Sequence, residues 1–388
     1  MQIILTCNYS PWSVYSGGGQ QVTHELATAL ARRGHNVTVV FTKAPWERVR
    51  SPSSLPYQLR WAILFDYRSR AGAPLRILSA WTVAAIVRQE LASGEPTVVH
   101  AQGEEAARLH HERARHRFGL VATPHYPSLP RGLFAPPRSA ARALSLLAGY
   151  GKYAALGAAL RTADVCAPPS HYGGDLIRRA YQLPAERIRP VHNGVPTEFL
   201  NHQWRPCVDR DTRPALFFGR FERSKGPDLL LRALRELGED APRLRLVGRG
   251  PYLATITRMR EEFGLTLKVE FREWAHHHEL GRLLTESSMV ILPSREENFA
   301  LAALSAMAVG VPLITTNVGG MAELVEHGES GVLCPAGDVT ALGEAIHQLR
   351  TWPEWATALG ARARRRVRDH FTWEIAVSKF ESLYNRLT

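Results

Sequence analysis

The stretch Pro293-Ser294-Arg295-Glu296-Glu297-Asn298-Phe299-Ala300-Leu301, which runs on to Gly310-Val311-Pro312, decides the fold of this chain. The apolar run 289–292 before it predicts a buried strand. Residues 299–309 predict a helix that is apolar on nearly every face and is therefore buried. Gly310 and Pro312 end that helix, and residues 313–315 begin another strand. Such a β-loop-α-β unit points helix N–H groups at an anion.

Two adjacent acids, Glu296 and Glu297, lie beside this predicted anion site. Two carboxylates next to a phosphate would repel it. One interpretation is that both acids lie in the first helical turn, where they interact favourably with the helix dipole. The other is that at least one of them binds a different part of the ligand, such as sugar hydroxyls.

Length and composition predict a globular chain with two domains. The chain has 388 residues, of which 45% are hydrophobic and 22% are charged, and this length exceeds one ordinary core. No apolar run reaches the roughly 18 residues of a membrane span, and residues 1–5 lack the basic region and cleavage site of a signal peptide. The four cysteines are scattered, without metal spacing or a disulfide framework, which predicts a reducing cytoplasm.

The formal net charge of +12 predicts an anionic partner, such as nucleic acid, a phosphorylated substrate or a lipid surface. No zinc-finger, recognition-helix or stacking signature supports nucleic acid, so none is expected. Residues 44–81 interleave arginines with aromatic residues, namely Trp46, Tyr57, Trp61, Tyr67 and Trp81. This pattern suits an anionic partner or a membrane boundary, and it is also compatible with a solvated surface around a few core aromatics.

In the N-terminal half, Gly17-Gly18-Gly19 follows a predicted strand at 2–7 and directly precedes a predicted helix, Gln20 to Arg33. Glycines there let the backbone approach a ligand closely, although a plain tight turn would have the same sequence. The spacing is not G-x-G-x-x-G, so a nicotinamide cofactor is not expected. His125 follows a strand at 121–124, and open α/β sheets bind ligands at such strand ends. A lone histidine is more often structural.

The polar segment 197–214 predicts a domain boundary. Strands and helices alternate on both sides of it, which predicts an α/β protein with two Rossmann-like, doubly wound parallel sheets facing each other across a cleft. The predicted domains are residues 1–196 and residues 197–371. A final helix at about 372–388 is assigned to the N-terminal domain by the resemblance given below.

Two loops of the C-terminal half suit a diphosphate. Gly219-Arg220 and Lys225-Gly226 flank a turn after a strand, where an arginine fork and a lysine charge can clamp phosphates. The next strand ends in Gly248-Arg249-Gly250, which again permits close backbone approach. His276-His277-His278 has no acidic or cysteine partners, so no metal site is expected.

In order and spacing these segments resemble the retaining glycosyltransferases of family 4, which have the two-Rossmann GT-B fold. The resemblance covers essentially the whole chain. Besides the segments above, it rests on Arg33-Gly34-His35, Val99-His100, Asn193-Gly194-Val195, Gly319-Gly320, Glu323 and Phe371-Thr372-Trp373-Glu374.

This resemblance implies an enzyme that moves a sugar from a nucleotide diphosphate sugar, with a UDP-sugar favoured, to a hydroxyl acceptor with retention. The acceptor class stays open between a sugar, a lipid-linked molecule and a small natural product. The family reacts by a front-face path without metal or cofactor. A cytoplasmic location is implied, with peripheral contact to an anionic inner membrane surface left open.

By motif position, the resemblance implies that Arg220 and Lys225 hold the diphosphate, Glu297 binds sugar hydroxyls and His125 contacts the sugar. These four are the candidate catalytic residues. The candidate donor-binding residues are Gly18, Gly19, Gly219, Gly248, Arg249, Asn298, Phe299, Ala300, Leu301 and Ser305.

One departure from the family pattern is Ser305, which stands where the family has a second glutamate that accepts hydrogen bonds from both ribose hydroxyls. A serine cannot act as a charged, two-way acceptor, so nucleotide binding is expected to weaken by about 1.5–3 kcal/mol. This departure keeps a second hypothesis open, that of a catalytically weak nucleotide-sugar-binding protein or partner subunit. A glycoside hydrolase needs two carboxylates on either side of the scissile bond, and adjacent Glu296 and Glu297 do not provide them.

Overall fold

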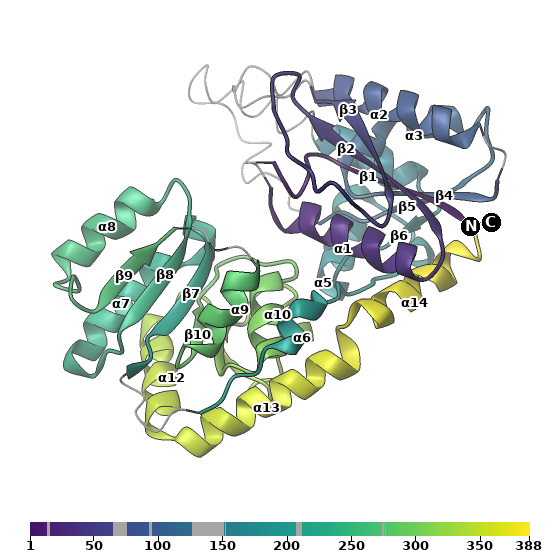
Figure 1. The fold of residues 1–388 in the computed structure, drawn as a ribbon. Helices are drawn as coiled ribbons and strands as arrows, with labels where there is room; N and C mark the ends of the chain where they lie inside the picture. Colours follow the sequence, from purple (N-terminus) through teal and green to yellow (C-terminus); the bar gives the residue numbers. More distant parts are fainter. Residues whose placement is uncertain are drawn as a thin grey trace. The chain divides into compact units, whose positions relative to one another are not determined.

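The computed structural model describes residues 1–13, 16–64, 76–92, 95–125, 151, 153–206, 212–273, 275 and 277–388. The chain divides into two compact units (Figure 1). The first unit comprises Met1–His192 and Trp373–Thr388, and the second comprises Asn193–Thr372. The chain therefore passes between the units at 192/193 and at 372/373, where the sequence analysis places the boundaries at 196/197 and 371/372.

The first unit is built on a six-stranded parallel sheet with the order β3-β2-β1-β4-β5-β6. The strands are β1 (Gln2–Cys7), β2 (Asn36–Lys43), β3 (Gln58–Ile63), β4 (Thr97–Ala101), β5 (Gly119–Ala122) and β6 (Val165–Cys166). The helices include α1 (Gly18–Arg32), α2 (Arg76–Leu91), α3 (Leu109–Glu112) and α5 (His171–Tyr181). The carboxyl ends of all six strands lie at one edge of the sheet.

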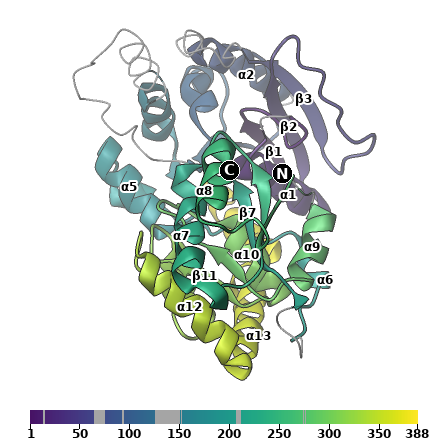
Figure 2. The same ribbon diagram turned by 90° about the vertical axis from the view of Figure 1, so that its left-hand side faces the viewer.

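The second unit repeats this topology with the order β12-β11-β10-β7-β8-β9. Its strands are β7 (Ala215–Arg220), β8 (Leu244–Arg249), β9 (Val269–Arg272), β10 (Val290–Leu292), β11 (Leu313–Thr316) and β12 (Val332–Cys334). Its helices are α6 (Thr197–Asn201), α7 (Pro227–Leu237), α8 (Leu253–Glu262), α9 (His277–Thr285), α10 (Leu301–Val309), α11 (Met321–Leu324), α12 (Val339–Thr351) and α13 (Pro353–His370). In Figures 1 and 2, α7 and α12 lie side by side.

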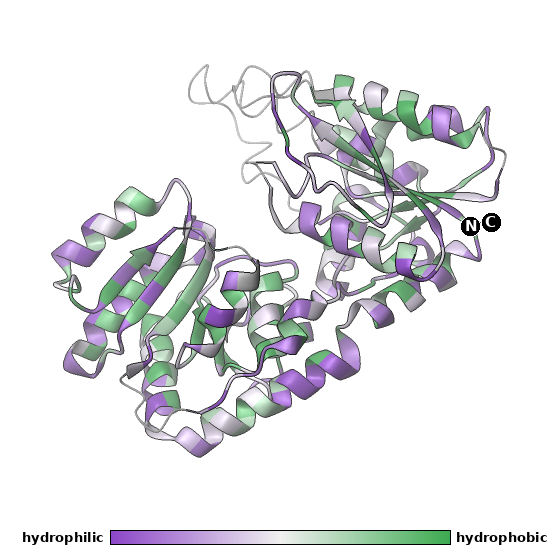
Figure 3. Cartoon of the chain, in the orientation of Figure 1, coloured by the Kyte–Doolittle hydropathy of each residue, from purple (hydrophilic) through white to green (hydrophobic). Residues whose placement is uncertain are grey.

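Helices on both faces explain why the central strands are buried along their whole length. Every residue of β1 and β4 is buried, whereas the outer helices alternate hydrophilic and hydrophobic residues (Figure 3). Helix α10 is the exception, because seven of its residues are buried and it packs against α6, α9 and α13. The predicted pair of doubly wound parallel-sheet domains is therefore confirmed.

The predicted starts of two helices were wrong. Helix α1 begins at Gly18 rather than Gln20, so Gly18 and Gly19 form its first turn and Gly17 is its N-cap. Helix α10 begins at Leu301 rather than Phe299, because Ala300 is in an extended conformation as the N-cap. Glu296 and Glu297 consequently precede the helix, and the interpretation of both as first-turn acids is wrong.

The C-terminal helix α14 (Trp373–Tyr384) packs on α1 and belongs to the first unit. The phenol of Tyr384 is buried against His100 Nδ1 at 2.6 Å, and Arg33 and His35 contact Glu381 at 3.0 and 2.8 Å. Gly119 has no side chain and so leaves room for the residues after α14, because a Cβ on Gly119 would lie 2.5 Å from the Leu387 side chain.

Parts of several predictions lie outside the described residues. They are Tyr67 with its neighbouring arginines, His276 of the histidine run, and residues 139–150 and 152 of a helix that the sequence predicts at 139–161. Within the segment 44–81, Tyr57 is buried whereas Trp46 and Trp81 are exposed. Among the residues described, no helix combines the length and the apolar character needed to cross a bilayer.

Candidate functional site

The candidate residues of the second unit gather where the strand order reverses. Strands β7 and β10 are neighbours in the middle of the sheet, and the chain leaves them in opposite directions. Open α/β sheets bind ligands outside the carboxyl ends of the strands at this point. Arg220 is the last residue of β7, Lys225 lies in the segment that follows it, and the loop after β10 carries Glu297.

Lys225 and Glu297 form the central ion pair of this site. Lys225 Nζ lies 2.6 Å from Glu297 Oε1, and the two side chains are 21% and 9% exposed. The Ser294 hydroxyl donates a second hydrogen bond to the same oxygen at 3.1 Å. Both charged groups are thus held in place, at the end of two neighbouring strands, by contacts across the two loops.

A second ion pair fixes the same two loops to each other. Arg295 donates to both oxygens of Asp228 at 2.8 and 2.7 Å and to the carbonyl of Arg223 at 2.7 Å. Asp228 is buried at the start of α7. A bidentate pair of this kind fixes direction as well as distance, so it holds the Lys225 loop against the Glu297 loop.

Glycines allow the backbone to come this close. Gly226 has a φ of +70°, and a Cβ there would lie 1.9 Å from the carbonyl oxygen of Pro293. Gly248 has a φ of +155°, and its Cβ would lie 1.9 Å from the carbonyl oxygen of Gly219. Gly219 itself has a φ of +147° and faces open space. Only glycine suits such positions without strain.

The remaining second-unit candidates are distributed around this pair. Arg220 is exposed and contacts Glu222 at 2.6 Å, and Arg249 is exposed at the end of β8. Asn298, Phe299 and Ala300 are buried in the loop that leads into α10, and the N-cap of α10 makes no side-chain cap hydrogen bond. Ser305 is buried within α10 and donates to the Leu301 carbonyl at 3.0 Å.

In the first unit, the structure brings His125 and the glycine loop together. His125 follows β5, and the loop Gly17–Gly19 connects β1 to α1. A Cβ on Gly19 would lie 3.0 Å from His125 Cδ2, so the imidazole packs on the first turn of α1. Gly18 is exposed at the same helix start. His125 Nε2 lies 2.7 Å from Gln102 Oε1.

Burial keeps the histidines at this edge neutral. It lowers the pKa of His125 to about 4 and that of His100, on β4, to about 3. His100 has structural partners at both nitrogens, the phenol of Tyr384 and the hydroxyl of Thr123. These contacts give His100 a structural role.

A buried carboxyl group, Glu105, lies where the strand order of the first sheet reverses, between β1 and β4. Its Oε1 accepts hydrogen bonds from the Thr6 hydroxyl at 3.2 Å and from the N–H groups of Gln102 and Gly103 at 2.8 and 2.9 Å. Burial raises the pKa of Glu105 to about 7. Glu105 therefore holds the loop that carries Gln102.

Four of these residues were not predicted from the sequence. Gln102 and Glu105 lie in a polar run directly after a predicted strand, which was the available signal. Arg295 lies inside the quoted stretch, and Asp228 follows Gly226 by two residues. Each of the four has a partner 23 to 99 positions distant in the sequence, and local patterns could not reveal these pairs.

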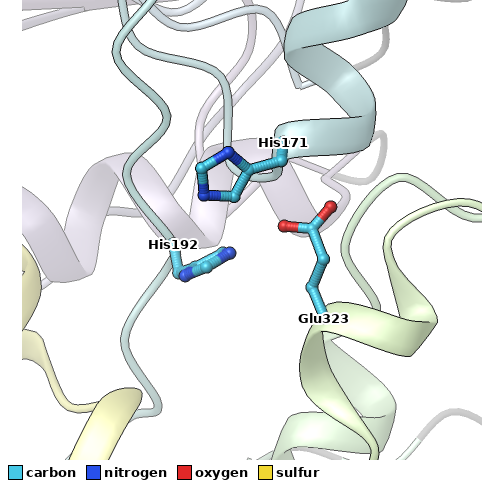
Figure 4. A group of neighbouring side chains, drawn as sticks. All are labelled: His171, His192 and Glu323. Carbon is cyan, nitrogen blue, oxygen red and sulfur yellow. The ribbon is translucent and has the colours of Figure 1, made fainter.

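One further group of side chains has metal-ligand chemistry. The rings of His171 and His192, both in the first unit, have centroids 5.8 Å apart (Figure 4). Glu323, the third residue drawn there, belongs to the second unit. Two histidines alone are fewer than the three protein ligands of a typical catalytic zinc site, so no metal site is assigned to them.

Sequence profiles of two families match consecutive parts of the chain. The profile described as Glycosyltransferase Family 4 matches residues 16–199, and the profile described as Glycosyl transferases group 1 matches residues 203–366. The two matches correspond closely to the two units.

Individual relatives agree with these profiles. The D-inositol 3-phosphate glycosyltransferase 1 of Catenulispora acidiphila is 31% identical over 331 residues, which cover 81% of this chain and 77% of that protein. The N-acetyl-alpha-D-glucosaminyl L-malate synthase of Bacillus anthracis is 29% identical over 234 residues. That alignment covers 58% of this chain and only 60% of the relative's length.

A solved structure shows the same fold. HepE of Anabaena, in complex with UDP and glucose, superposes with a TM-score of 0.76 over 100% of both chains at 17% identity. The profiles, the Catenulispora relative and the two six-stranded parallel sheets lead to one assignment. The chain belongs to the family 4 and group 1 glycosyltransferases of GT-B fold, enzymes that use a nucleotide-sugar donor.

Proposed function

We propose that this glycosyltransferase transfers the sugar of a UDP-sugar to a hydroxyl acceptor with retention of anomeric configuration and without a metal. The acceptor oxygen bonds to the anomeric carbon as the bond from that carbon to the β-phosphate oxygen breaks. The leaving phosphate oxygen takes the acceptor proton on the same face of the sugar, so no side chain needs to act as a base.

The observation that carries this proposal is the Lys225–Glu297 pair beside the start of α10. The pair lies where the strand order reverses, which is the ligand-binding position of such sheets. Lys225, Arg220 and the first N–H groups of α10 can stabilise the negative charge that develops on the leaving diphosphate, a contribution for which a metal would otherwise be needed.

Glu297 is the proposed ligand of the donor sugar. A carboxylate accepts hydrogen bonds from sugar hydroxyls, and its pairing with Lys225 places it beside the diphosphate without net repulsion. In the first unit, His125 is the proposed sugar contact, and Gly18 and Gly19 permit close approach of the α1 backbone to the diphosphate. Support for UDP comes from HepE, whose solved complex contains UDP and glucose.

Ser305 bears on the strength of donor binding. Its hydroxyl donates its proton to the Leu301 carbonyl, so the Ser305 oxygen can act toward the ribose only as a neutral hydrogen-bond acceptor. We therefore expect weak nucleotide affinity. The serine at this position is the observation behind the second hypothesis, in which the protein binds a nucleotide sugar but transfers the sugar slowly.

The test is a panel of UDP-, GDP- and ADP-sugars assayed for donor hydrolysis and for transfer, with the anomeric configuration of the product determined by NMR. Lys225→Ala is expected to lower kcat by about 10²–10³-fold, as for the loss of one group that stabilises the developing charge. Glu297→Gln is expected to lower it comparably, because a neutral amide accepts hydrogen bonds less strongly than a carboxylate.

Arg258→Ala is the matched control, since Arg258 and Glu262 form an exposed ion pair on α8 whose loss should leave kcat unchanged. Transfer should also persist in EDTA. Unchanged turnover in both site variants would refute the assignment of the site. Calorimetric binding of UDP-sugars with neither hydrolysis nor transfer would favour the second hypothesis.

A further inference from the structure

We propose that Gln102 is a positioning residue that holds His125 in the Nε2–H tautomer, so that Nδ1 carries the lone pair that accepts a hydrogen bond from a donor-sugar hydroxyl. This proposal rests on the proposed function of His125 as a sugar contact. It concerns a residue outside the family motifs of the sequence analysis.

The contact between the two side chains defines the tautomer. Gln102 Oε1 lies 2.7 Å from His125 Nε2. An amide oxygen can only accept a hydrogen bond, so Nε2 must carry the proton. A neutral imidazole has one protonated nitrogen, and the lone pair is then on Nδ1.

The imidazole is also neutral where it lies. Burial lowers its pKa to about 4, and its titratable neighbour His100 is neutral for the same reason. A neutral ring with a fixed tautomer can accept a hydrogen bond from a hydroxyl group. A protonated ring could only donate one.

Gln102 is itself held in place. Its side chain is 6% exposed, and its backbone N–H donates to Glu105 Oε1 at 2.8 Å. Glu105 in turn accepts from Thr6 on β1. The amide therefore starts from a loop fixed to two strands, and a flexible surface glutamine could not select a tautomer in this way.

The ring of His125 is held on its other side by α1. A Cβ on Gly19 would lie 3.0 Å from His125 Cδ2, the carbon bonded to Nε2. The Nε2–Cδ2 edge of the ring thus faces the protein, with Gln102 at the nitrogen and the glycine turn at the carbon. This arrangement fixes the ring orientation as well as its proton.

The direct test is long-range ¹H–¹⁵N NMR of the histidine-labelled protein at pH 7.5, with the signals assigned by their loss in His125→Asn. The wild-type ring is expected to show the Nε2–H pattern. Gln102→Leu removes the acceptor and should give a mixture of tautomers, together with a tenfold or larger fall in donor turnover. Gln102→Glu keeps an oxygen against Nε2 and should retain the Nε2 proton.

Gln2→Leu is the matched control. Gln2 is 5% exposed at the start of β1, at the opposite edge of the same sheet, and its Oε1 accepts a hydrogen bond from Thr97 at 2.6 Å. This change removes an equally buried amide without touching His125, so the tautomer and the turnover should both stay as in the wild type.

An Nδ1–H tautomer in the wild type would overturn the proposal, and so would an unchanged tautomer in Gln102→Leu. A changed tautomer with unchanged turnover would refute the positioning role. The NMR measurement needs no donor, so its result is separate from the proposed function, which the donor panel tests by itself.

Discussion

At the scale of single residues, Glu105 shows how a buried carboxyl group links stability to pH. Its pKa rises from 4.5 to about 7 because burial disfavours the charged form. The folded protein therefore binds the proton more tightly than the unfolded chain. The contribution of this group to the free energy of unfolding is fully present below pH 4.5 and is lost as the pH rises through 7. The loss is about 3 kcal/mol in total.

We expect Glu105→Gln to remove this pH dependence, because an amide does not titrate. Urea denaturation at pH 5 and pH 8 should show that, relative to the variant, the wild type loses about 2–3 kcal/mol between the two values. Glu186→Gln, at an exposed position of the first unit, should follow the wild type at both. An equal change in the free energy of unfolding between pH 5 and pH 8 for the wild type and Glu105→Gln would contradict a raised pKa for this carboxyl group.

The three charged residues of the loop before α10, namely Arg295, Glu296 and Glu297, also have separate roles. Glu297 pairs with Lys225, and Arg295 pairs with Asp228. Glu296 is exposed in the loop before α10. The sequence alone left two interpretations of the two glutamates open. The helix start excludes both from the first turn of α10, and the pairing with Lys225 distinguishes Glu297 from Glu296.

At the scale of elements, α14 is the helix whose place depends on long-range contacts. Its Tyr384 is fully buried and meets His100, which precedes it by 284 residues. Phe380 packs on the same imidazole with a centroid distance of 5.0 Å. The last helix of the chain is thus part of the core of the first unit.

Tyr384→Phe should destabilise the first unit by about 1–3 kcal/mol, since it leaves a buried imidazole nitrogen without its partner. Thermal or urea unfolding measures this loss. Ser378→Ala, which removes the exposed hydroxyl that Arg33 contacts at 3.0 Å, should change stability by less than about 0.5 kcal/mol. Equal effects of the two changes would show that the contact between Tyr384 and His100 adds nothing to the stability of the first unit.

At the scale of the whole molecule, the net charge of +12 combines with exposed aromatic residues in the first unit. Trp46 and Trp81 are 63% and 51% exposed, and the guanidinium carbon of Arg108 lies 4.1 Å from the centre of the Trp81 ring. Arginine and tryptophan side chains together suit the interface of an anionic bilayer. We propose that the exposed side chain of Trp81, with Arg108 beside it, makes peripheral contact with such a membrane.

Co-sedimentation with anionic vesicles at low salt tests that proposal. Wild-type protein should bind, and binding should weaken at high salt because the attraction is screened. Trp81→Ala should reduce it, whereas Trp352→Ala, which removes a tryptophan of similar exposure (54%) from the second unit, should not. No binding of the wild type at low salt would refute membrane contact.

The sequence by itself determined the architecture. Apolar runs of strand length, glycine turns and alternating helices are local signals, and they predicted two doubly wound parallel sheets correctly. The motif positions of Lys225 and Glu297 were also readable from sequence. The helix starts were placed two residues wrongly, because extended and helical backbone near a cap differ little in composition.

Only the tertiary structure decided which side chains meet. The pairs Lys225–Glu297, Gln102–His125 and His100–Tyr384 join residues 72, 23 and 284 positions apart. Each depends on strand order, on where a loop leaves its strand, or on where the last helix packs. A local sequence pattern specifies the conformation of its own segment, whereas such contacts exist only once the segments have been placed beside one another.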